Sequence, residues 1–338
     1  MIGSIRPLNS TTSSAAARAS SMRAAVLTAP GRIEMREVPV PEPSANEVLV
    51  RIEGCGVCAS NLSAWAGQLW FHYPFSPGEL GHEAFGRIEA AGPEVREFSP
   101  GERVAFLSNH GYAEFDCAAA TNVVSLPPEL DNVPVPGEPL GCAMNIFARS
   151  QINAGDTVAI VGIGFLGALL TQLAVAAGAR VFAINRRASG LSHARAAGAE
   201  ESIVCADNAS VLGKVRELTE EKLCDVVIEC VGKQAAIDLA TALTAVRGRL
   251  VIAGYHQDGP RSIDMQLWNW RGLDVINAHE RDPAVYLRGM QAAVAALVRR
   301  RLDHVPLCTH TLPLEELDIA LDLTRDRPDG FMKAIVCP

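Results

Sequence analysis

The sequence predicts an α/β protein in which a doubly wound parallel sheet is joined to a smaller, mostly antiparallel β domain. Three observations predict this fold. A glycine-rich turn follows a buried strand near residue 161, strand and helix patterns alternate from Gly155 to Asn277, and short strands separated by Pro and Gly turns precede them. The length of 338 residues indicates two domains, because single cores seldom grow beyond about 250–300 residues.

The opening βαβ unit of the predicted parallel sheet lies within residues 156–187. Val158–Val161 is a short apolar run, as expected for a strand buried on both faces. The apolar run 168–177 consists of good helix formers, and Gly178 stands where a helix would end in a left-handed turn. A second strand is expected over 180–184.

Gly162, Gly164 and Gly167 fit G-x-G-x-x-G between the first strand and the helix. The first glycine permits a tight turn, the second lets the backbone approach a pyrophosphate, and the third lets helix and strand pack closely. The free N–H groups at the helix start would hold the phosphates. We therefore expect a dinucleotide-binding (Rossmann) unit. The alternative is a glycine-rich turn in another kind of βαβ unit.

The other predicted elements fall into two regions with different strand and helix patterns. An antiparallel β domain is expected first, with strands at 23–27, 33–36, 47–53, 85–90, 103–107, 112–117 and 122–126. The parallel sheet continues with strands at 202–205, 225–230, 249–253 and 272–277, which gives about six in all. From about Pro283, two helical patterns and a last strand at 333–337 are expected.

Composition excludes several classes of protein. The net charge of −8 argues against general nucleic-acid binding, because little basic surface can neutralise phosphates. No apolar run reaches the roughly 18 residues of a membrane span. The nine cysteines are scattered and no secretory segment precedes them, so a cytoplasmic location is expected. Residues 1–21 lack acids, and a disordered arm, or a true start at Met22, is favoured over a transit peptide.

Three candidate metal ligands come from separated segments. Cys58 follows a predicted strand, His82 precedes another, and Glu138 lies in a third segment expected to be a loop. Structural zinc sites draw their ligands in close pairs, whereas catalytic sites use about three protein ligands and keep one position open. The set therefore suits a catalytic metal. Singly, the three have plainer interpretations, as a core cysteine, a turn histidine and a surface acid.

Four motifs in order resemble the zinc-dependent medium-chain dehydrogenase/reductase family: GVCASN (56–61), PGELGHEAFG (77–86), GEPLGCA (137–143) and VGIGFLG (161–167). The Glu-Pro-Leu segment resembles the polyol and threonine dehydrogenase branch of that family. The resemblance covers Met22 to Pro338, and it implies a GroES-like catalytic domain beside the Rossmann domain. It also implies that the last roughly 60 residues return to the catalytic domain. The expected domains are 22–140 and 278–338 (catalytic) and 141–277 (dinucleotide-binding).

The resemblance also implies roles for individual residues. Cys58 and His82 match the thiolate and imidazole ligands of zinc. Glu83 is an adjacent acid that can approach the metal, and Glu138 takes the third-ligand place. Ser60 matches the hydroxyl that passes on the proton of the alcohol.

Three departures from the family pattern matter. Asn61 stands where the family usually has an aspartate behind the zinc-bound histidine, and Ser63 stands where some members have a relay histidine. The lobe with four cysteines that holds a structural zinc in many members is absent, since Cys117 is the only cysteine between Val104 and Gly137. One zinc per chain is therefore expected. Cys55 is expected to pack behind the site.

Together these observations predict hydride transfer between an alcohol or carbonyl substrate and a nicotinamide cofactor, assisted by zinc. The alternatives are a zinc-independent quinone or enoyl reductase of the same fold, and a nucleotide-binding relative without catalysis. A homodimer or homotetramer is expected.

The end of the second strand predicts which cofactor binds. NAD-binding units usually place an acid there, whereas this chain has Asn185 followed by Arg186 and Arg187. Arginine pairs with a 2′-phosphate, so NADP is favoured over NAD, unless both arginines are simply solvated. The full set of expected cofactor-binding residues is Gly162, Gly164, Phe165, Leu166, Gly167, Asn185, Arg186, Arg187, Val231 and Lys333, the last near the pyrophosphate by the family resemblance.

The substrate end of the site is expected to be polar. The loop 278–281 follows the sixth strand and carries His279, and the shortened loop that lacks the cysteine lobe carries Asn109 and His110. Buried polar groups without partners lose about 1–3 kcal/mol each, so a substrate with several hydroxyls fits better than a simple alcohol. A polyol, sugar or similar alcohol is therefore expected, with His279 contacting it, unless the loop merely faces water.

Overall fold

The computed structural model describes residues 20–338 and contains a six-stranded sheet. Its strand order is β10-β9-β8-β11-β12-β13, and every neighbouring pair is parallel. The chain proceeds outward from β8 and then returns to β11, so the switch point lies between these two strands. The doubly wound sheet predicted from the sequence is confirmed. Its strands are β8 (Thr157–Val161), β9 (Arg180–Asn185), β10 (Glu201–Val204), β11 (Cys224–Glu229), β12 (Thr244–Ile252) and β13 (Asp274–Asn277).

The glycine turn has the conformation that its sequence predicts. Gly162 has a φ of +98°, in the left-handed region that favours glycine. A Cβ on Gly167 would lie 2.0 Å from the carbonyl oxygen of Gly162, so only glycine fits there. The helix begins at Phe165, earlier than expected, because Gly164 already has the extended conformation of an N-cap. The helices of this lobe are α3 (Phe165–Ala176), α4 (Ala188–Ala196), α5 (Asn208–Leu218), α6 (Gln234–Leu243) and α7 (Met265–Arg271).

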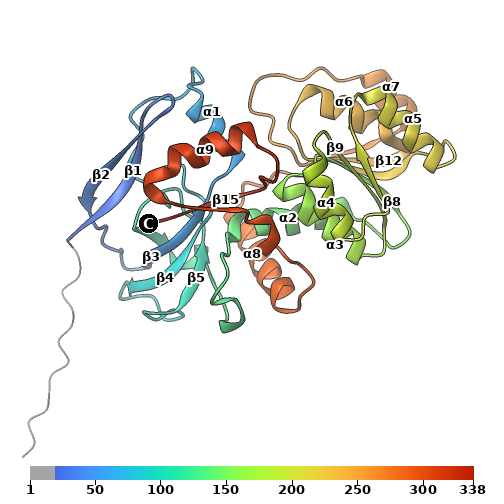
Figure 1. Ribbon diagram of the computed structural model, residues 1–338. Coiled ribbons are helices and arrows are strands. Elements are labelled where there is room, and N and C mark those ends of the chain that lie inside the picture. The colour runs from blue at the N-terminus through green and yellow to red at the C-terminus, as the bar shows by residue number, and fades with distance from the viewer. Residues whose placement is uncertain (1–19) are drawn as a thin grey trace, which may run out of the picture.

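The second lobe is built on a mostly antiparallel sheet, as predicted (Figure 1). Its strand order is β14-β15-β3-β4-β5-β7, with β6 paired to β3 and a separate β1–β2 hairpin. The strand expected at 112–117 begins only at Phe115, because Tyr112 is buried and its backbone bonds to Ala25 and Gly78. The strands are β1 (Ser21–Ala29), β2 (Arg32–Pro39), β3 (Glu47–Gly56), β4 (Ala84–Ala91), β5 (Arg103–Phe106), β6 (Phe115–Ala119) and β7 (Val123–Ser125).

The C-terminal segment returns to this second lobe. Strand β15 (Ala334–Cys337) pairs antiparallel with β3, and β14 (His310–Pro313), which was not expected, pairs parallel with β15. Figure 1 shows α9 (Leu317–Asp326) on the same lobe, beside β15. The remaining short elements are η1 (Ala59–Asn61), α1 (Leu62–Trp65), η2 (Ala120–Asn122), η3 (Pro128–Leu130), η4 (Val305–Leu307) and η5 (Leu314–Glu316).

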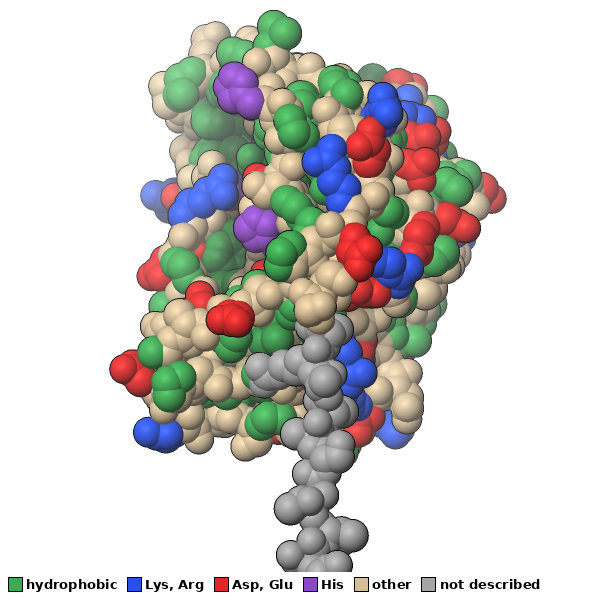
Figure 2. Space-filling view, turned by 90° about the vertical axis from the view of Figure 1, so that its left-hand side faces the viewer, with side chains coloured by type: hydrophobic (Ala, Val, Ile, Leu, Met, Phe, Trp, Pro, Cys, Tyr) green, Lys and Arg blue, Asp and Glu red, His purple; other side chains and the backbone are tan. Residues whose placement is uncertain are grey.

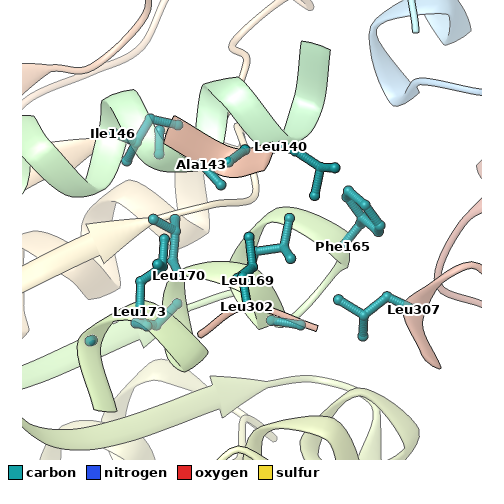
Figure 3. Packing of buried hydrophobic residues seen from close by; sticks show 14 of the residues in the cluster. Leu140, Ala143, Ile146, Phe165, Leu169, Leu170, Leu173, Leu302 and Leu307 are labelled. Carbon is teal, nitrogen blue, oxygen red and sulfur yellow. The ribbon is translucent and has the colours of Figure 1, made fainter. Parts of the chain in front are cut away.

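Two helices join the lobes. The segment that begins at Gly137, expected to be a loop, is the start of α2 (Gly137–Ser150), and the predicted boundary after residue 140 falls inside this helix. Helix α8 (Pro283–Val298) packs against α2 at Gly141 and Gly289, where a Cβ on Gly289 would lie 2.6 Å from the Gly141 carbonyl oxygen. Figure 3 shows Leu140, Ala143 and Ile146 of α2 facing Leu169, Leu170 and Leu173 of α3.

The surface charges and helix lengths of this protein bear on whether it can bind charged partners or cross a membrane. On the face of the molecule seen in Figure 2, acidic and basic side chains are interspersed. Within residues 20–338, every helix is too short or too polar to cross a membrane. Most of the predicted N-terminal arm, residues 1–19, lies outside the described residues, and Ser21 already opens β1.

Candidate active site

A cavity of about 620 Å³ lies between the two lobes, beside the switch point of the parallel sheet. Its walls combine loops of the β lobe, the glycine turn, and the start of α2. Most of the site residues predicted from the sequence line it: Cys58, Ser60, His82, Glu83, Glu138, Gly164, Phe165, Leu166, Gly167, Arg187, Val231, His279 and Lys333.

Three of these residues form a cluster able to hold a metal ion. One ligand atom each of Cys58, His82 and Glu83 lies within 4.8 Å of the others. Cys58 caps the first turn after β3, and His82 and Glu83 lead into β4, so two adjacent strands of one sheet position the cluster. Thiolate, imidazole and carboxylate are all ligands that zinc accepts, and three leave a position open. The donor set therefore fits a catalytic zinc.

The imidazole of His82 is oriented by a backbone carbonyl. Its Nδ1 lies 2.9 Å from the oxygen of Leu80 and must carry the proton, which leaves Nε2 free to bind a metal. Burial alone would lower the pKa of His82, but the hydrogen bond to Cys58 and the charges of Cys58, Glu138 and Glu83 raise it to about 10. The site thus has a negative potential, which favours a cation.

Asn61, which replaces the aspartate usual in the family, does not accept a hydrogen bond from His82. Its amide nitrogen donates instead to the Leu80 oxygen (3.1 Å) and to the hydroxyl of Tyr112 (2.7 Å). Asn61 therefore fixes the carbonyl that orients His82, one step further from the metal site.

Glu83 and Lys333 form a buried ion pair. The ammonium nitrogen of Lys333 lies 2.6 Å from Oε1 of Glu83, and both side chains are almost fully buried. A Cβ on Gly56 would overlap the Glu83 carboxylate, at 1.9 Å from Oε2. Lys333 was expected near the cofactor pyrophosphate. It lines the main cavity, with its ammonium 5.0 Å from the centroid of the Phe165 ring at the start of α3, and it also pairs with Glu83 because β15 lies directly beside β3.

Glu138 lies on the cavity wall but outside the cluster of three. It occupies the first turn of α2, and its Oε1 accepts a hydrogen bond from the Cys142 thiol at 3.2 Å. Burial raises the pKa of Glu138, and the charge of Glu83 adds to this effect, whereas the charge of His82 opposes it. Cys55 is fully buried, and burial also raises the pKa of its thiol, as expected for a packing role.

Ser60 lies beside the metal cluster, with its Oγ 3.5 Å from Nε2 of His82. Ser63, which replaces the relay histidine, is hydrogen-bonded to the Gln257 side chain, and Gln257 also donates to the Ala59 oxygen at 3.0 Å. Gln257 follows β12 in the other lobe, so it spans the cleft. Gln257 could not be predicted as a site residue, because an isolated glutamine in a loop carries no local signal.

A second cavity, of about 430 Å³, adjoins the first one and shares Ser60, His82 and Gln257 with it. Aromatic and polar side chains both line it, including Trp70, Phe71, Ser63, Asn109 and Tyr255. His82 of the metal cluster lines this second cavity, whereas the glycine turn lines only the main one, so the second cavity suits a substrate.

The two histidines expected to contact substrate differ in their position relative to the cavities. His279 lines the main cavity, and its Nε2 lies 3.0 Å from the Gly254 carbonyl oxygen. His110 is exposed and lines neither cavity, because its neighbour Asn109 takes the inward place. A substrate contact of His110 therefore stays a prediction, and His279 is the histidine that lines the main cavity.

Of the residues expected to distinguish NADP from NAD, some line the cavity and others do not. Arg187 lines the cavity, whereas Arg186 is exposed and does not. Asn185 braces the glycine turn: its Oδ1 accepts from the Ile163 amide (3.2 Å), and its Nδ2 donates to the Arg187 oxygen (2.8 Å). Gly162 forms the turn behind the cavity wall rather than the wall itself.

A buried acid, not anticipated, organises the loop that carries Gln257. Oε1 of Glu229 accepts from the backbone amides of Val231 and Gly232, both at 2.7 Å. Its Oε2 lies 3.1 Å from Nε2 of His256, whose Nδ1 accepts from Arg261. Because arginine only donates, His256 must carry its proton on Nε2, directed at Glu229. An acid at the end of an apolar strand was the available signal.

The fold and site together define a class. A Rossmann sheet is joined to a GroES-like lobe with a Cys, His and Glu cluster at the junction. Residues 44–132 match the family model of the alcohol dehydrogenase GroES-like domain, and residues 166–295 match that of the zinc-binding dehydrogenases. The chain belongs to the zinc-type medium-chain dehydrogenase/reductase family. It is a dehydrogenase.

Similar proteins agree with this assignment. Sorbitol dehydrogenase of Rattus norvegicus is 28% identical over 92% of this chain and 95% of its own length. Among solved structures, a zinc-binding dehydrogenase of Sinorhizobium meliloti bound to NADP has a TM-score of 0.80 at 28% identity, covering 95% of this chain and 100% of its own. Alcohol dehydrogenase TADH of Thermus sp. ATN1 has a TM-score of 0.79 at 25% identity, covering 94% and 99%.

Proposed function

We propose that this dehydrogenase transfers a hydride between NADP and a polyol, sugar or similarly polar secondary alcohol, with one catalytic zinc per chain. One observation supports this most directly. The Cys58, His82 and Glu83 cluster and the glycine turn line the same cavity, so a metal-held substrate and a cofactor ring can meet there. In this proposal, residues 22–140 and 278–338 form the catalytic domain, and residues 141–277 form the dinucleotide-binding domain. The chain passes from the first to the second within α2.

Cys58 and His82 would hold the zinc, and either Glu83 or Glu138 would complete the site. The pairing of Glu83 with Lys333 weakens its case as a ligand, whereas Glu138 has only a thiol as partner. Bound there, zinc would act as a Lewis acid on the oxygen of the alcohol or carbonyl. The described residues contain one such cluster, which supports a single zinc.

Ser60 would take the proton from the alcohol, because its hydroxyl lies at the border of both cavities beside His82. Ser63 and Gln257 cannot store that proton, since neither a hydroxyl nor an amide titrates near neutral pH. The proton would therefore leave to water through the second cavity.

NADP is favoured by Arg187, which lines the cavity after β9, and by the absence of an acid at Asn185. The NADP-bound structure of the Sinorhizobium meliloti relative is consistent with this. Comparing kcat/KM for the two cofactors tests the proposal, and a clear preference for NAD would overturn it.

A polyol is favoured by the sorbitol dehydrogenases among the relatives, and by the polar groups of Ser63, Asn109 and Gln257 around the second cavity. The decisive experiment measures metal content and assays polyols, sugars and simple alcohols with both cofactors. About one zinc per chain with polyol-dependent reduction of NADP supports the proposal. A zinc-free active protein would point to the quinone or enoyl reductase alternative.

We also propose a homodimer or homotetramer in the cytoplasm. Strand β13 is the edge of its sheet, and Trp270 and Val275 are exposed beside it. An unpaired edge with apolar side chains is suited to pairing with a second copy. All nine cysteines are free, as in a reducing compartment. Light scattering would give the oligomeric state.

A further inference from the structure

Arg327 is a basic residue of the β lobe that reaches the glycine turn of the other lobe. It follows α9, which belongs to the segment that packs beside β15. Its Nη1 lies 3.6 Å from the position that a Cβ on Gly164 would occupy. Gly164 is the N-cap of α3, where free backbone amides point into the cavity. The guanidinium and the helix start therefore lie close together on the wall of the same cavity.

The charge of Arg327 has no acidic partner in the part of the chain that the structure describes. Its Nε donates to the Thr324 oxygen at 3.2 Å, and the only cation beside it is Arg187, whose side chain donates to the Arg327 carbonyl. Arg327 as a whole residue is exposed, but packing around its guanidinium lowers the pKa, the charge of Arg187 lowers it further, and the charge of Cys58 opposes both effects. Two guanidinium groups thus converge on the cavity, an arrangement that an anionic ligand would relieve.

Neighbouring basic residues are used differently. Lys333 is paired with Glu83, and Arg325, two residues before Arg327, forms ion pairs with Asp322 and Asp326. Arg327, unlike Lys333 and Arg325, therefore has a positive charge without an acidic partner within residues 20–338, and it can bind an anionic ligand in the cleft.

We infer that Arg327 is a cofactor-binding residue that holds the diphosphate of the dinucleotide against the amides of α3, with Arg187 keeping it in place. Lys333 lines the same cavity, and its predicted place near the pyrophosphate stays a prediction beside that of Arg327. Because Arg327 and Gly164 come from different lobes, a bound diphosphate would also hold the lobes together. This inference rests on the cofactor part of the proposed function.

The test is calorimetric binding of ADP-ribose, which carries the diphosphate, and of 2′-AMP, which carries only the 2′-phosphate. The variant Arg327→Asn removes the charge, and asparagine tolerates the positive φ of 47° at this position. We expect Kd for ADP-ribose to rise at least about 10-fold, with Kd for 2′-AMP nearly unchanged. Arg327→Lys, which keeps a charge, should lie between this variant and the unmodified protein.

Arg325→Asn is the matched control, since Arg325 lies in the last turn of α9, two residues before Arg327, and is already paired with acids. It should leave both affinities unchanged, and thermal melting should show both variants folded. If Arg327→Asn binds ADP-ribose as tightly as the control does, or loses affinity for both ligands equally, the inference is wrong. If the unmodified protein binds neither ADP-ribose nor 2′-AMP, the proposed cofactor itself is wrong.

Discussion

The metal cluster and the glycine turn lie in one cavity but are built in opposite ways. The cluster consists of side chains from separate segments, held by a buried ion pair and by carbonyl contacts. The turn consists of backbone within one continuous segment, where Gly162 and Gly167 admit no other residue without strain. Chemistry therefore depends on the first region and cofactor affinity on the second, so changes in each should separate the two properties.

The largest effect is expected at the cluster. Cys58→Ala or His82→Ala should remove zinc and nearly all turnover, because the open-site ligand set is broken. Binding of ADP-ribose should be nearly unchanged, since neither ligand belongs to the glycine turn or to Arg327, where the diphosphate is proposed to bind. Metal analysis, steady-state kinetics and calorimetry measure the three properties. Normal turnover in the Cys58→Ala protein would exclude the zinc mechanism.

The buried ion pair behind the cluster predicts the next effect. Lys333→Met leaves the Glu83 carboxylate buried without its partner, and should lower the free energy of unfolding by about 3–5 kcal/mol. The double variant with Glu83→Gln should recover part of this loss, because no charge is then left unpaired. Urea unfolding of the zinc-loaded proteins measures both. Equal stability of Lys333→Met and the unmodified protein would contradict the pairing.

The glycine turn should separate stability from affinity. Gly167→Ala places a Cβ 2.0 Å from the Gly162 oxygen, and should lower the free energy of unfolding by about 1–3 kcal/mol. Gly164→Ala meets only the Arg327 side chain at 3.6 Å, so the free protein should be as stable as the unmodified one while ADP-ribose binds more weakly. Thermal melts with and without ADP-ribose compare the two, and equal melting of both free variants would refute the distinction.

The smallest effects are expected at the substrate end. Gln257→Ala removes the contacts with Ser63 and Ala59, and should change kcat/KM for hydroxylated substrates by about 10-fold, equivalent to a hydrogen bond of about 1–1.5 kcal/mol. His279→Ala should lower kcat/KM for polyols but not for simple alcohols. If neither variant changes the ratio between the two substrate classes, contact of these residues with substrate is refuted.

Much of the architecture could be read from the sequence, because its signals are local. The βαβ unit at 156–187 was predicted from contiguous residues, and Gly162, Gly178 and the six parallel strands are as expected. Cys58 and His82 were recognisable from the motifs around them, and the structure brings them together. Element ends were less well predicted, as at Phe115 and Gly137, because burial and helix caps set them.

The sequence by itself determined the turn, the sheet and the identity of the candidate ligands, since steric limits and apolar periodicity act over a few residues. Only the tertiary structure decided which side chains contact one another across the site. Lys333 meets Glu83 across 250 positions because β15 pairs beside β3, and Gln257 reaches Ser63 across 194 because a loop crosses the cleft. Arg327 faces Gly164 for the same reason. Such contacts depend on how the lobes pack, and no local pattern encodes them.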